Sequence, residues 1–412
     1  FPCQCNISGH YNNRLLMLFE TLDNKEECVG VYCNNELHFD AIPDDLTHTW
    51  NYSAFLRDRT NVEYAFLYAQ KALEDACPVH LAQEWETING RMKAFLCAFT
   101  AAKIDLTENC FFDLVNECFL REYCEMKNKI TEHVFKTHEK PENYDFLVDL
   151  TKVLHDMKHR KIQIDPWALR DIMHQKRARN FTQKLSQISL SCDYNIFGTK
   201  TGRLTTKKNS FPVLTMDKKF RKVVTPTNDW FVSLDFNGAE LRTFLALSDM
   251  EQPDFDVHDW NRKNVYKSTL TREDAKERFF AWLYNPKSQD LMSERAYNKD
   301  AVMEKHWWNG AITNAFGRTI AADAHHAMSY LIQSTCSDVV LRQMIKLDRY
   351  LSDKASFVAF CVHDEVVLDM ENSECSSLVN VLVEHFSNTA LGKFGVNVKY
   401  GKSYGDMREW KQ

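Results

Sequence analysis

A short apolar run that ends in an aspartate constrains this chain more than any other stretch. Residues 230–234, Trp-Phe-Val-Ser-Leu, are followed by Asp235, by the turn-forming pair Asn237-Gly238 and then by an apolar helical pattern. Such a run predicts a buried strand that delivers a carboxylate to the edge of a sheet. A carboxylate at a sheet edge is in position to bind a metal ion.

A second stretch, residues 356–370, has the form strand, acidic tip, strand. Its tip is His363-Asp364-Glu365 between two apolar runs, which predicts an antiparallel hairpin with Asp364 at the turn. Asp235 and Asp364 would then be strand-end carboxylates from distant parts of the chain. Two such groups can hold two divalent cations about 4 Å apart, the arrangement used for in-line displacement at phosphorus. The pair therefore predicts phosphoryl-transfer chemistry.

Between these stretches, residues 272–284 carry four side chains that recur at every fourth position. They are Arg272, Lys276, Phe280 and Tyr284, and this spacing places them on one face of a helix. Two cations followed by two aromatic rings suit a triphosphate followed by a base. A stripe of core residues is the alternative for the two rings, but a core stripe does not usually share its face with Arg and Lys.

Taken in order, these stretches resemble the family A, DNA polymerase I-like, DNA polymerases. The ordered matches lie within residues 199–369 and are Thr201-Gly-Arg203, the segment from Asp235 to Arg242, the helix of residues 272–284, Phe316-Gly-Arg318, Ile332-Gln333 and the Val-His-Asp-Glu hairpin. The resemblance implies an α+β right-hand polymerase with an antiparallel-sheet palm and with helical fingers and thumb. It also implies a template-directed enzyme that extends a primer 3′-hydroxyl with dNTPs.

The resemblance assigns a role to individual residues. The carboxylates of Asp235 and Asp364 and the backbone carbonyl of Phe236 would hold two Mg²⁺ ions, and Lys276 would donate a proton to the departing pyrophosphate. The incoming nucleotide would be bound by Arg272, Lys276, Phe280, Tyr284, His258 and Glu240. The primer-template would be bound by Arg203, Gln333, His363, Thr201, Lys207 and Lys208. For His258, a role as a capping or surface residue is the alternative.

Two other functions stay open beside this one. A single-subunit RNA polymerase of the phage type shares the two aspartates, the lysine and the tyrosine. Glu240 argues against it, because in the DNA-making family that glutamate fills the space beside the sugar 2′ position. A catalytically inactive nucleic-acid-binding subunit that kept the fold is the second alternative, and a primer-extension assay separates it from an enzyme.

Three departures from the family pattern concern contacts with primer and template. They are Asn237-Gly238 inside the first acidic motif, Asn285 after the cationic helix and Ser329 four residues before Gln333. The catalytic carboxylates are untouched by these changes.

The charge of the chain is distributed unevenly. The whole chain has a formal net charge of −6, yet residues 151–222 carry 17 Lys and Arg against 5 Asp and Glu, a local charge of +12. Clusters of this kind bind a phosphate backbone through counterion release. The segment is therefore predicted to bind DNA, and residues 167–188 are expected to form a basic amphipathic helix.

The first 80 residues predict a truncated and inactive relative of a 3′-5′ exonuclease. The family often carries that domain before the polymerase, with an Asp-x-Glu strand motif and a Tyr-x3-Asp motif. Here the comparable positions hold Glu20 as the one acid, Arg57 and Asn61, so a two-metal hydrolytic site cannot be assembled. The expected sub-domains are an exonuclease-like α/β remnant (1–80), thumb (81–200), first palm segment (201–256), fingers (257–320) and second palm segment (321–412).

Composition limits where and with what the protein works. No apolar run approaches the roughly 20 residues of a membrane span, so we expect no membrane contact and a monomer that binds primer-template DNA and dNTPs. A processivity factor, helicase or primase would be a further partner. The thirteen cysteines lack regular spacing, which favours free thiols in a reducing cytoplasm, the host cytoplasm if the source is a virus or phage.

Two questions about the ends of the chain stay open in the sequence. Cys3, Cys5, Cys28 and Cys33 form two close pairs, but their spacings match no common zinc site. The chain begins Phe-Pro-Cys-Gln-Cys, without an initiator methionine, so we expect it to be cut from a longer polypeptide. Whether it serves replication, repair or lesion bypass is not encoded in these motifs.

Overall fold

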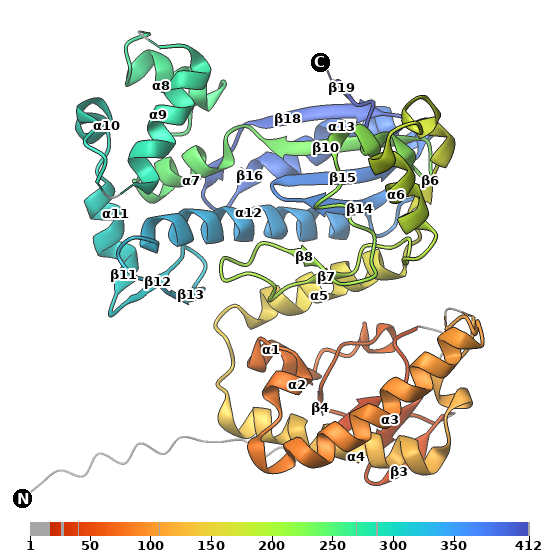
Figure 1. Ribbon diagram of the computed structural model, residues 1–412. Helices are drawn as coiled ribbons and strands as arrows, with labels where there is room; N and C mark the ends of the chain where they lie inside the picture. The colour runs from red at the N-terminus through yellow and green to blue at the C-terminus, as the bar shows by residue number, and fades with distance from the viewer. Residues whose placement is uncertain are drawn as a thin grey trace, which may run out of the picture. The chain divides into compact units, whose positions relative to one another are not determined.

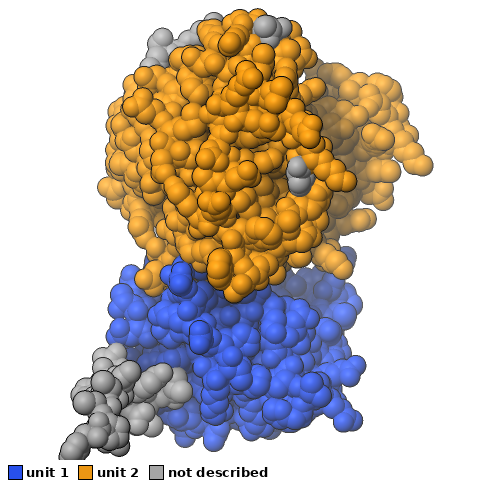
Figure 2. All heavy atoms as spheres, turned by 90° about the vertical axis from the view of Figure 1, so that its left-hand side faces the viewer, with its two compact units in different colours: residues 1–144 blue, residues 145–412 orange. Residues whose placement is uncertain are grey.

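The computed structural model describes residues 17–25, 29–39, 41–106, 108–268, 270–285 and 287–410. The chain forms two compact units that divide between Tyr144 and Asp145, and Figure 2 colours them separately. Each unit has a hydrophobic core of its own. Within the described ranges, the helices all lack the combination of length and apolar character that a membrane crossing requires.

The N-terminal unit combines short strands with two long helices (Figure 1). Three strands form an antiparallel sheet in the order β1-β2-β3, and β4 pairs in parallel with β5. The strands are β1 (Phe19–Thr21), β2 (Val31–Cys33), β3 (Glu36–His38), β4 (His48–Thr49) and β5 (Glu63–Tyr64). The α-helices are α1 (Ala65–Ala69), α2 (Leu73–Ala76), α3 (Ala82–Ala101) and α4 (Glu117–Thr137), with 3₁₀ turns at Ala54–Leu56 (η1), Val79–Leu81 (η2) and Phe111–Leu114 (η3).

The core of this unit joins two segments that the sequence assigns to different sub-domains. Trp50, from the predicted remnant, is buried in one cluster with Trp85 of α3 and Phe119 of α4. The expected boundary after residue 80 therefore does not separate two units, because the apolar faces of α3 and α4 pack on the preceding residues. The division after Tyr144 instead cuts through the segment 81–200 that was predicted as thumb.

The C-terminal unit is built on a five-stranded antiparallel sheet in the order β14-β15-β10-β18-β19 (Figure 1). The strand predicted from the sequence is β10, at the centre. Its register places Asp235 opposite Glu365 of β15 and opposite Asn397 of β18. The five strands are β10 (Trp230–Phe236), β14 (Phe357–Val362), β15 (Glu365–Met370), β18 (Val396–Gly401) and β19 (Arg408–Glu409).

The other elements of this unit surround the sheet. Its α-helices are α5 (Tyr144–His159, of which Tyr144 belongs to the N-terminal unit), α6 (Lys176–Leu185), α7 (Ala239–Leu247), α8 (Val257–Asn264), α9 (Arg272–Tyr284), α10 (Leu291–Ala296), α11 (Lys299–His306), α12 (Ala327–Leu351) and α13 (Asn372–Ser387). Short strands are β6 (Gln163–Ile164), β7 (Tyr194–Asn195), β8 (Thr205–Thr206), β9 (Val224–Thr225), β11 (Trp307–Trp308), β12 (Ala311–Thr313), β13 (Thr319–Ala321), β16 (Asn388–Thr389) and β17 (Gly392–Lys393). The 3₁₀ turns are η4 (Pro166–Ile172) and η5 (Lys218–Val223).

The helix α13 covers one face of β10. The ring of Phe236 stacks on Phe386 of α13 with the centroids 4.3 Å apart, so this side of the strand faces α13. Side chains alternate along a strand, so Asp235 points to the opposite face together with Phe231 and Ser233. The catalytic candidate thus lies on the face that α13 does not cover.

The helices α7 to α11 gather beyond the carboxyl end of β10 (Figure 1). Their shared core includes Phe244 of α7 and Phe279 and Trp282 of α9, whose rings meet edge to face. Helix α9 has the predicted bounds, and its aromatic core side fixes it against α7. The Phe316-Gly-Arg318 motif lies in the turn between β12 and β13.

One predicted helix is shorter than expected. The basic helix of residues 167–188 divides into η4 and α6, because the chain is extended at Gln175. In the N-terminal unit, α1 is also short and ends at the left-handed Gln70.

Candidate active site

The carboxylate of Asp235 lies at the carboxyl end of β10. Its only hydrogen bond within the described residues comes from Asn397 Nδ2, at 3.3 Å from Oδ2. Burial raises the pKa of Asp235 to about 6, and the nearby carboxylates of Glu365 and Asp364 add to the increase. Asp235 is therefore a partly dehydrated carboxylate that no cationic side chain contacts directly.

The second carboxylate, Asp364, lies in the two-residue turn between β14 and β15. The preceding His363 has a φ of +57°, a left-handed conformation that is uncommon outside glycine, and its side chain is exposed. The thiol of Cys336 on α12 lies 3.7 Å from Asp364 Oδ1. Burial raises the pKa of Asp364, although Arg203 opposes the increase. Both predicted metal ligands are thus brought to one end of the sheet.

The two carboxylates suit a hard divalent cation. Among the described residues, no three His, Cys, Asp or Glu side chains form a group that could hold a metal ion. Mg²⁺ is usually held by one or two carboxylates together with substrate phosphates rather than by an all-protein cage. A pair of dehydrated carboxylates with raised pKa values fits that ligand set, since a bound cation would offset the cost of their burial.

The predicted face of α9 is separate from its core side. The buried residues of the helix are Ala275, Phe279, Trp282 and Leu283, whereas Lys276 is exposed and the rings of Phe280 and Tyr284 are half-buried. Those two rings are nearly parallel, with centroids 5.8 Å apart. Along the stripe, Arg272 and Lys276 reach solvent, whereas the rings of Phe280 and Tyr284 are half-buried and also pack against the core of the C-terminal unit.

Comparisons with known proteins support this arrangement. Residues 288–412 match the family model described as DNA polymerase family A. This C-terminal part of the chain is therefore similar to the family A DNA polymerases. Among solved structures it is similar to the POL domain of Pol1 from M. smegmatis in complex with DNA primer-template and dNTP, with a TM-score of 0.55 and 13% identity over 70% of this chain and 75% of that chain. A search of curated proteins finds no match.

These findings confirm the predicted family and a family A polymerase-like fold of mixed helices and sheets.

In the C-terminal unit, Glu240 joins two of the predicted motifs. Its carboxylate accepts a hydrogen bond from the Tyr284 hydroxyl at 2.7 Å and forms an ion pair with Arg203 Nη2 at 2.9 Å. Burial raises the pKa of Tyr284, and the Glu240 carboxylate raises it further. Arg242, the neighbour that could have been the partner of Glu240, is buried and bonds to backbone carbonyls instead.

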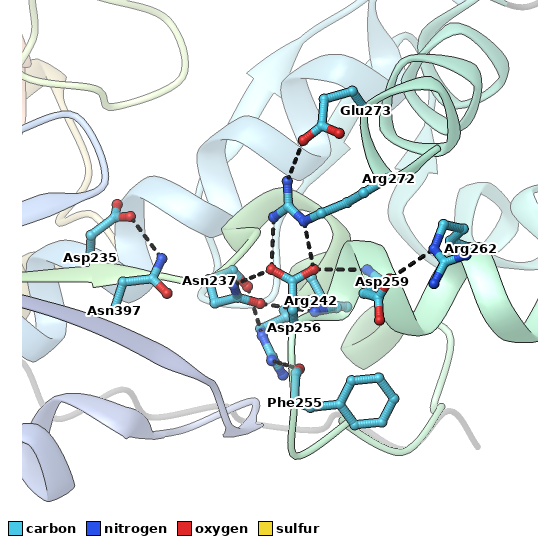
Figure 3. Close-up of polar contacts among 11 residues, drawn as sticks. Asp235, Asn237, Arg242, Phe255, Asp256, Asp259, Arg262, Arg272, Glu273 and Asn397 are labelled. Carbon is cyan, nitrogen blue, oxygen red and sulfur yellow. Dashed lines mark hydrogen bonds and ion pairs between the residues drawn. The ribbon is translucent and has the colours of Figure 1, made fainter. Parts of the chain in front are cut away.

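The first residue of α9 is already engaged. Arg272 makes a two-point contact with Asp256, with Nε 3.0 Å from Oδ1 and Nη2 2.7 Å from Oδ2 (Figure 3). His258 is buried, and its Nδ1 lacks a hydrogen-bond partner in the described part of the chain. Burial, followed by the charges of Lys276 and Arg272, lowers the pKa of His258 to about 4. His258 is therefore a neutral imidazole close to the cationic face.

The residues predicted to contact primer and template are placed differently from one another. Thr201 is buried, Gln333 is half-buried on α12, and Lys207 pairs with Asp193 at 3.1 Å. Lys208 is exposed beside it in the segment that follows β8. Arg203, also predicted to contact primer and template, pairs with the predicted nucleotide-binding residue Glu240.

The Thr-Gly-Arg and Phe-Gly-Arg motifs meet in the structure. Gly202 has a φ of +75°, and a Cβ there would lie 2.7 Å from the guanidinium carbon of Arg318. Arg318 is held by the fully buried Asp338 on α12, with its Nη2 2.7 Å from Oδ1. Glycine is required at this position because the arginine occupies the space of a side chain.

Three elements of the basic segment lie away from the two carboxylates, although Arg203 of the same segment pairs with Glu240 and acts on the pKa of Asp364. The elements η4, α6 and η5 lie near the start of β10, because β6 pairs with β9 and Phe181 of α6 stacks on Phe220 of η5 at 4.7 Å. Asp235 is at the other end of the strand, about 17 Å away at roughly 3.4 Å per residue. Trp167 on η4 is 80% exposed. This surface is therefore separate from the site around Asp235.

Three residues that the sequence left without a role organise the site. Arg242 donates to the carbonyls of Asn237, Pro253 and Phe255, at 2.8, 2.9 and 2.9 Å. Asn237 and Asp256 then bond to each other (Figure 3). The one signal in the sequence was the helix-capping character of Asp256, which accepts from Asp259 N at the start of α8.

In the N-terminal unit, Glu20, the one acid at the comparable exonuclease positions, is inaccessible to solvent. Glu20 on β1 is fully buried, and its carboxylate is bonded by Lys127 Nζ at 2.6 Å and by Thr131 Oγ1 at 3.3 Å. Arg57 and Asn61 are exposed. Of the cysteines considered for zinc, Cys3, Cys5 and Cys28 lie outside the described residues, and Cys33 is a buried free thiol. Eight other described cysteines are also free, and Cys110 is disulfide-bonded.

Proposed function

We propose that this DNA polymerase extends the 3′-hydroxyl of a primer with dNTPs under the direction of a template strand, by two-metal-ion nucleotidyl transfer. One observation carries the proposal. Two strand-end carboxylates with raised pKa values lie at the carboxyl end of β10, and α9, which gathers beyond that end, carries two cations and two half-buried aromatic rings on one face. An acid pair and a triphosphate-shaped surface together suit phosphoryl transfer better than either alone.

Asp235 and Asp364, with the backbone carbonyl of Phe236, would hold two Mg²⁺ ions. When bound, such ions activate the attacking hydroxyl and neutralise the charge that develops on the phosphates. The protein's own contribution is to hold Asp235 at the end of β10 next to the β14–β15 turn that carries Asp364. The backbone pairing of β10 with β15 places Asp235 opposite Glu365, the residue that follows Asp364.

The face of α9 would bind the nucleotide in the order in which its residues occur. Arg272 and Lys276 would contact the phosphates, and Lys276 would pass a proton to the leaving pyrophosphate. Phe280 and Tyr284 would stack against the base and sugar. His258, held neutral by burial, would contribute a hydrogen bond and no charge.

Glu240 would exclude ribonucleotides. Its two bonds, from Tyr284 and Arg203, hold the carboxylate in one place. A ribose 2′-hydroxyl beside it would have to clash with the carboxylate or break one of those bonds. The tie to Tyr284 on α9, the predicted nucleotide-binding helix, favours a DNA polymerase over the RNA polymerase alternative.

The polymerase would lack proofreading. The carboxylate of Glu20 is neutralised by Lys127, and the other two positions of the exonuclease motifs are the exposed Arg57 and Asn61. A hydrolytic two-metal site needs several carboxylates that face a common point. Helices α3 and α4 pack on this region, which suits a structural platform.

A primer-extension assay with the full chain tests the proposal. Primed DNA is incubated with Mg²⁺ and dNTPs, with Mg²⁺ and rNTPs, or with Mg²⁺ alone and a 3′-mismatched primer. We expect extension with dNTPs, little with rNTPs and no shortening of the primer. Preferred use of rNTPs would support the RNA polymerase alternative, and binding without any extension would support an inactive subunit.

A further inference from the structure

The carboxylate of Asp256 is shared by three elements of the C-terminal unit (Figure 3). Its Oδ1 accepts from Arg272 Nε at 3.0 Å and from Asp259 N at 2.8 Å. Its Oδ2 accepts from Arg272 Nη2 at 2.7 Å and from Asn237 Nδ2 at 2.8 Å. The side chain thus joins the start of α8, the start of α9 and the segment between β10 and α7.

Asn237 connects this carboxylate to the catalytic strand. It follows Asp235 by two residues, and all four of its polar groups are bonded. Its backbone N–H donates to Gly395 O at 2.8 Å, and its carbonyl accepts from Arg242 Nε at 2.8 Å. Its side chain accepts from Val257 N at 2.9 Å and donates to Asp256. Because four hydrogen bonds hold Asn237, the position of Asp256 is fixed relative to the end of β10.

The bonds of Arg272 leave part of its guanidinium free. A guanidinium has five N–H donors, and the edge formed by Nε and Nη2 faces Asp256. The Nη1 group contacts Glu273 at 3.3 Å, in a largely exposed pair. An arginine fixed along one edge can present its remaining donors to a ligand without first losing the freedom of a long side chain.

We propose that Asp256 and Asn237 are positioning residues that hold Arg272 in the orientation in which it receives the nucleotide's triphosphate. The inference rests on the proposed function and deepens it, because it concerns the affinity for the nucleotide. Arg272 is linked to Asp235 through two contacts and one short stretch of chain: Asn237 follows Asp235 by two residues, Asn237 bonds to Asp256, and Asp256 bonds to Arg272. The opposite arrangement, in which Asp256 acts as a counter-ion that competes with the triphosphate, makes the opposite prediction for KM.

The test is single-nucleotide insertion by the full chain on primed DNA, with KM for dNTP and kcat measured separately. Asp256→Asn removes the charge and turns one acceptor oxygen into a donor that faces other donors. We expect it to raise KM about 3- to 10-fold, the range for releasing one long side chain, with kcat changed less. Asp249→Asn is the matched control. Asp249 forms an exposed ion pair with Lys305, with Nζ 2.6 Å from Oδ2, and takes no part in the hydrogen bonds of Asp256.

A double-mutant comparison separates positioning from support of the fold. If Asp256 acts through Arg272, adding Asp256→Asn to Arg272→Ala raises KM no further than Arg272→Ala alone. Independent, multiplying effects would overturn the inference, as would an unchanged or lowered KM in Asp256→Asn.

Should a melting curve show that Asp256→Asn is unfolded, Asn237→Ser, which keeps the carboxylate, must raise KM in the same way. An inactive wild type would overturn the proposed function and this inference together, whereas an active wild type with an indifferent Asp256→Asn would overturn the inference alone.

Discussion

Two strand-borne acids in this molecule have opposite surroundings. Glu20 on β1 of the N-terminal unit is fully buried, and an ammonium group, that of Lys127, lies 2.6 Å from it. Asp235 on β10 of the C-terminal unit is partly dehydrated, and its one hydrogen bond within the described ranges comes from a neutral amide at 3.3 Å. The first carboxylate is satisfied by the protein, whereas the second is left for a ligand.

The difference shows how an acid can be assigned to structure or to chemistry. Burial lowers the pKa of the Lys127 ammonium group, but Glu20, Tyr123 and Cys124 together raise it, and burial raises the pKa of Glu20 itself. The 2.6 Å contact with Lys127 therefore leaves Glu20 bonded by the protein rather than by a ligand. Near Asp235, by contrast, the neighbouring charges include two more carboxylates, and its pKa lies at about 6. Repulsion of this kind is tolerated where a cation or a reaction requires it.

The largest expected effect concerns Asp235 and Asp364, the two acids proposed to bind metal. Asp235→Asn or Asp364→Asn should reduce the primer-extension rate by about 10³-fold or more, because each variant loses a metal ligand whose contribution is several kcal/mol. Primer-template affinity should stay largely intact, since the basic surface of η4, α6 and η5 is not altered. Extension rates and DNA binding would be measured on the same preparations.

The matched control is Glu20, the buried acid that pairs with Lys127. Glu20→Gln should leave the extension rate per folded molecule unchanged. Near wild-type extension by either aspartate variant would remove the basis of the site assignment. Trimming of a mismatched primer that persists in Asp364→Asn but disappears in Glu20→Gln would show that the N-terminal unit is an active nuclease.

Much of the site could be predicted from sequence because its elements are locally encoded. The four-residue spacing from Arg272 to Tyr284 defines α9, and the run that ends at Asp235 defines β10. The hairpin around Asp364 has apolar strands on either side of a polar turn. In each case the pattern lies within about fifteen residues and does not depend on distant contacts.

The parts that sequence did not predict depend on distant contacts. The bond between Asn237 and Asp256 requires the loop that Arg242 holds through Pro253 and Phe255, and no local pattern specifies that path. The boundary after Tyr144 depends on which core the apolar faces of α3 and α4 join. Periodicity shows that a helix has a buried face but not what covers it.

A second variant tests the ion pair between Glu20 and Lys127. Lys127→Met should lower the free energy of unfolding of the N-terminal unit by about 3–5 kcal/mol, because it leaves the Glu20 carboxylate buried without its cation. Chemical denaturation would measure the change. Lys136→Met is the control: Lys136 pairs with Glu132 in an exposed ion pair, for which a loss below about 1 kcal/mol is expected.

Replacing both members of the buried pair distinguishes a structural acid from a catalytic one. Glu20→Leu combined with Lys127→Met should recover most of the stability, since apolar groups of similar size commonly substitute for a buried ion pair. A double variant as unstable as Lys127→Met alone would contradict this interpretation of Glu20.

A third variant concerns Glu240, an acid that is satisfied by the site itself. Glu240→Ala should lower the preference for dNTP over rNTP by about 10- to 100-fold, corresponding to about 1–3 kcal/mol for a lost polar or steric contact. Incorporation of dNTP should fall much less. Single-nucleotide insertion with both substrates, alongside a melting curve, measures the ratio.

Tyr284→Phe is the matched variant for Glu240, because it removes the hydroxyl donor and keeps the ring. It should weaken sugar selection less than Glu240→Ala, since Arg203 still holds the carboxylate. If Glu240→Ala instead loses stability and both activities together, Glu240 supports the fold around Arg203 and does not select the sugar.

The smallest expected effect concerns metal binding by the protein alone. If Asp235 and Asp364 form an open site, Mg²⁺ should raise the melting temperature of the C-terminal unit, whereas Glu20, already neutralised by Lys127, should contribute nothing to the shift. At a Mg²⁺ concentration about ten times Kd, the stabilisation is about 1.4 kcal/mol, or roughly 2–4 °C for a unit of this size. The shift should vanish with chelator and in Asp235→Asn, and persist in Glu20→Gln.

Without DNA or nucleotide the site lacks the phosphate oxygens that complete the coordination of Mg²⁺, so adding primed DNA and dNTP should enlarge the shift in the wild type. A shift of equal size in wild type and Asp235→Asn would place the bound cation elsewhere and remove the distinction between the two acids.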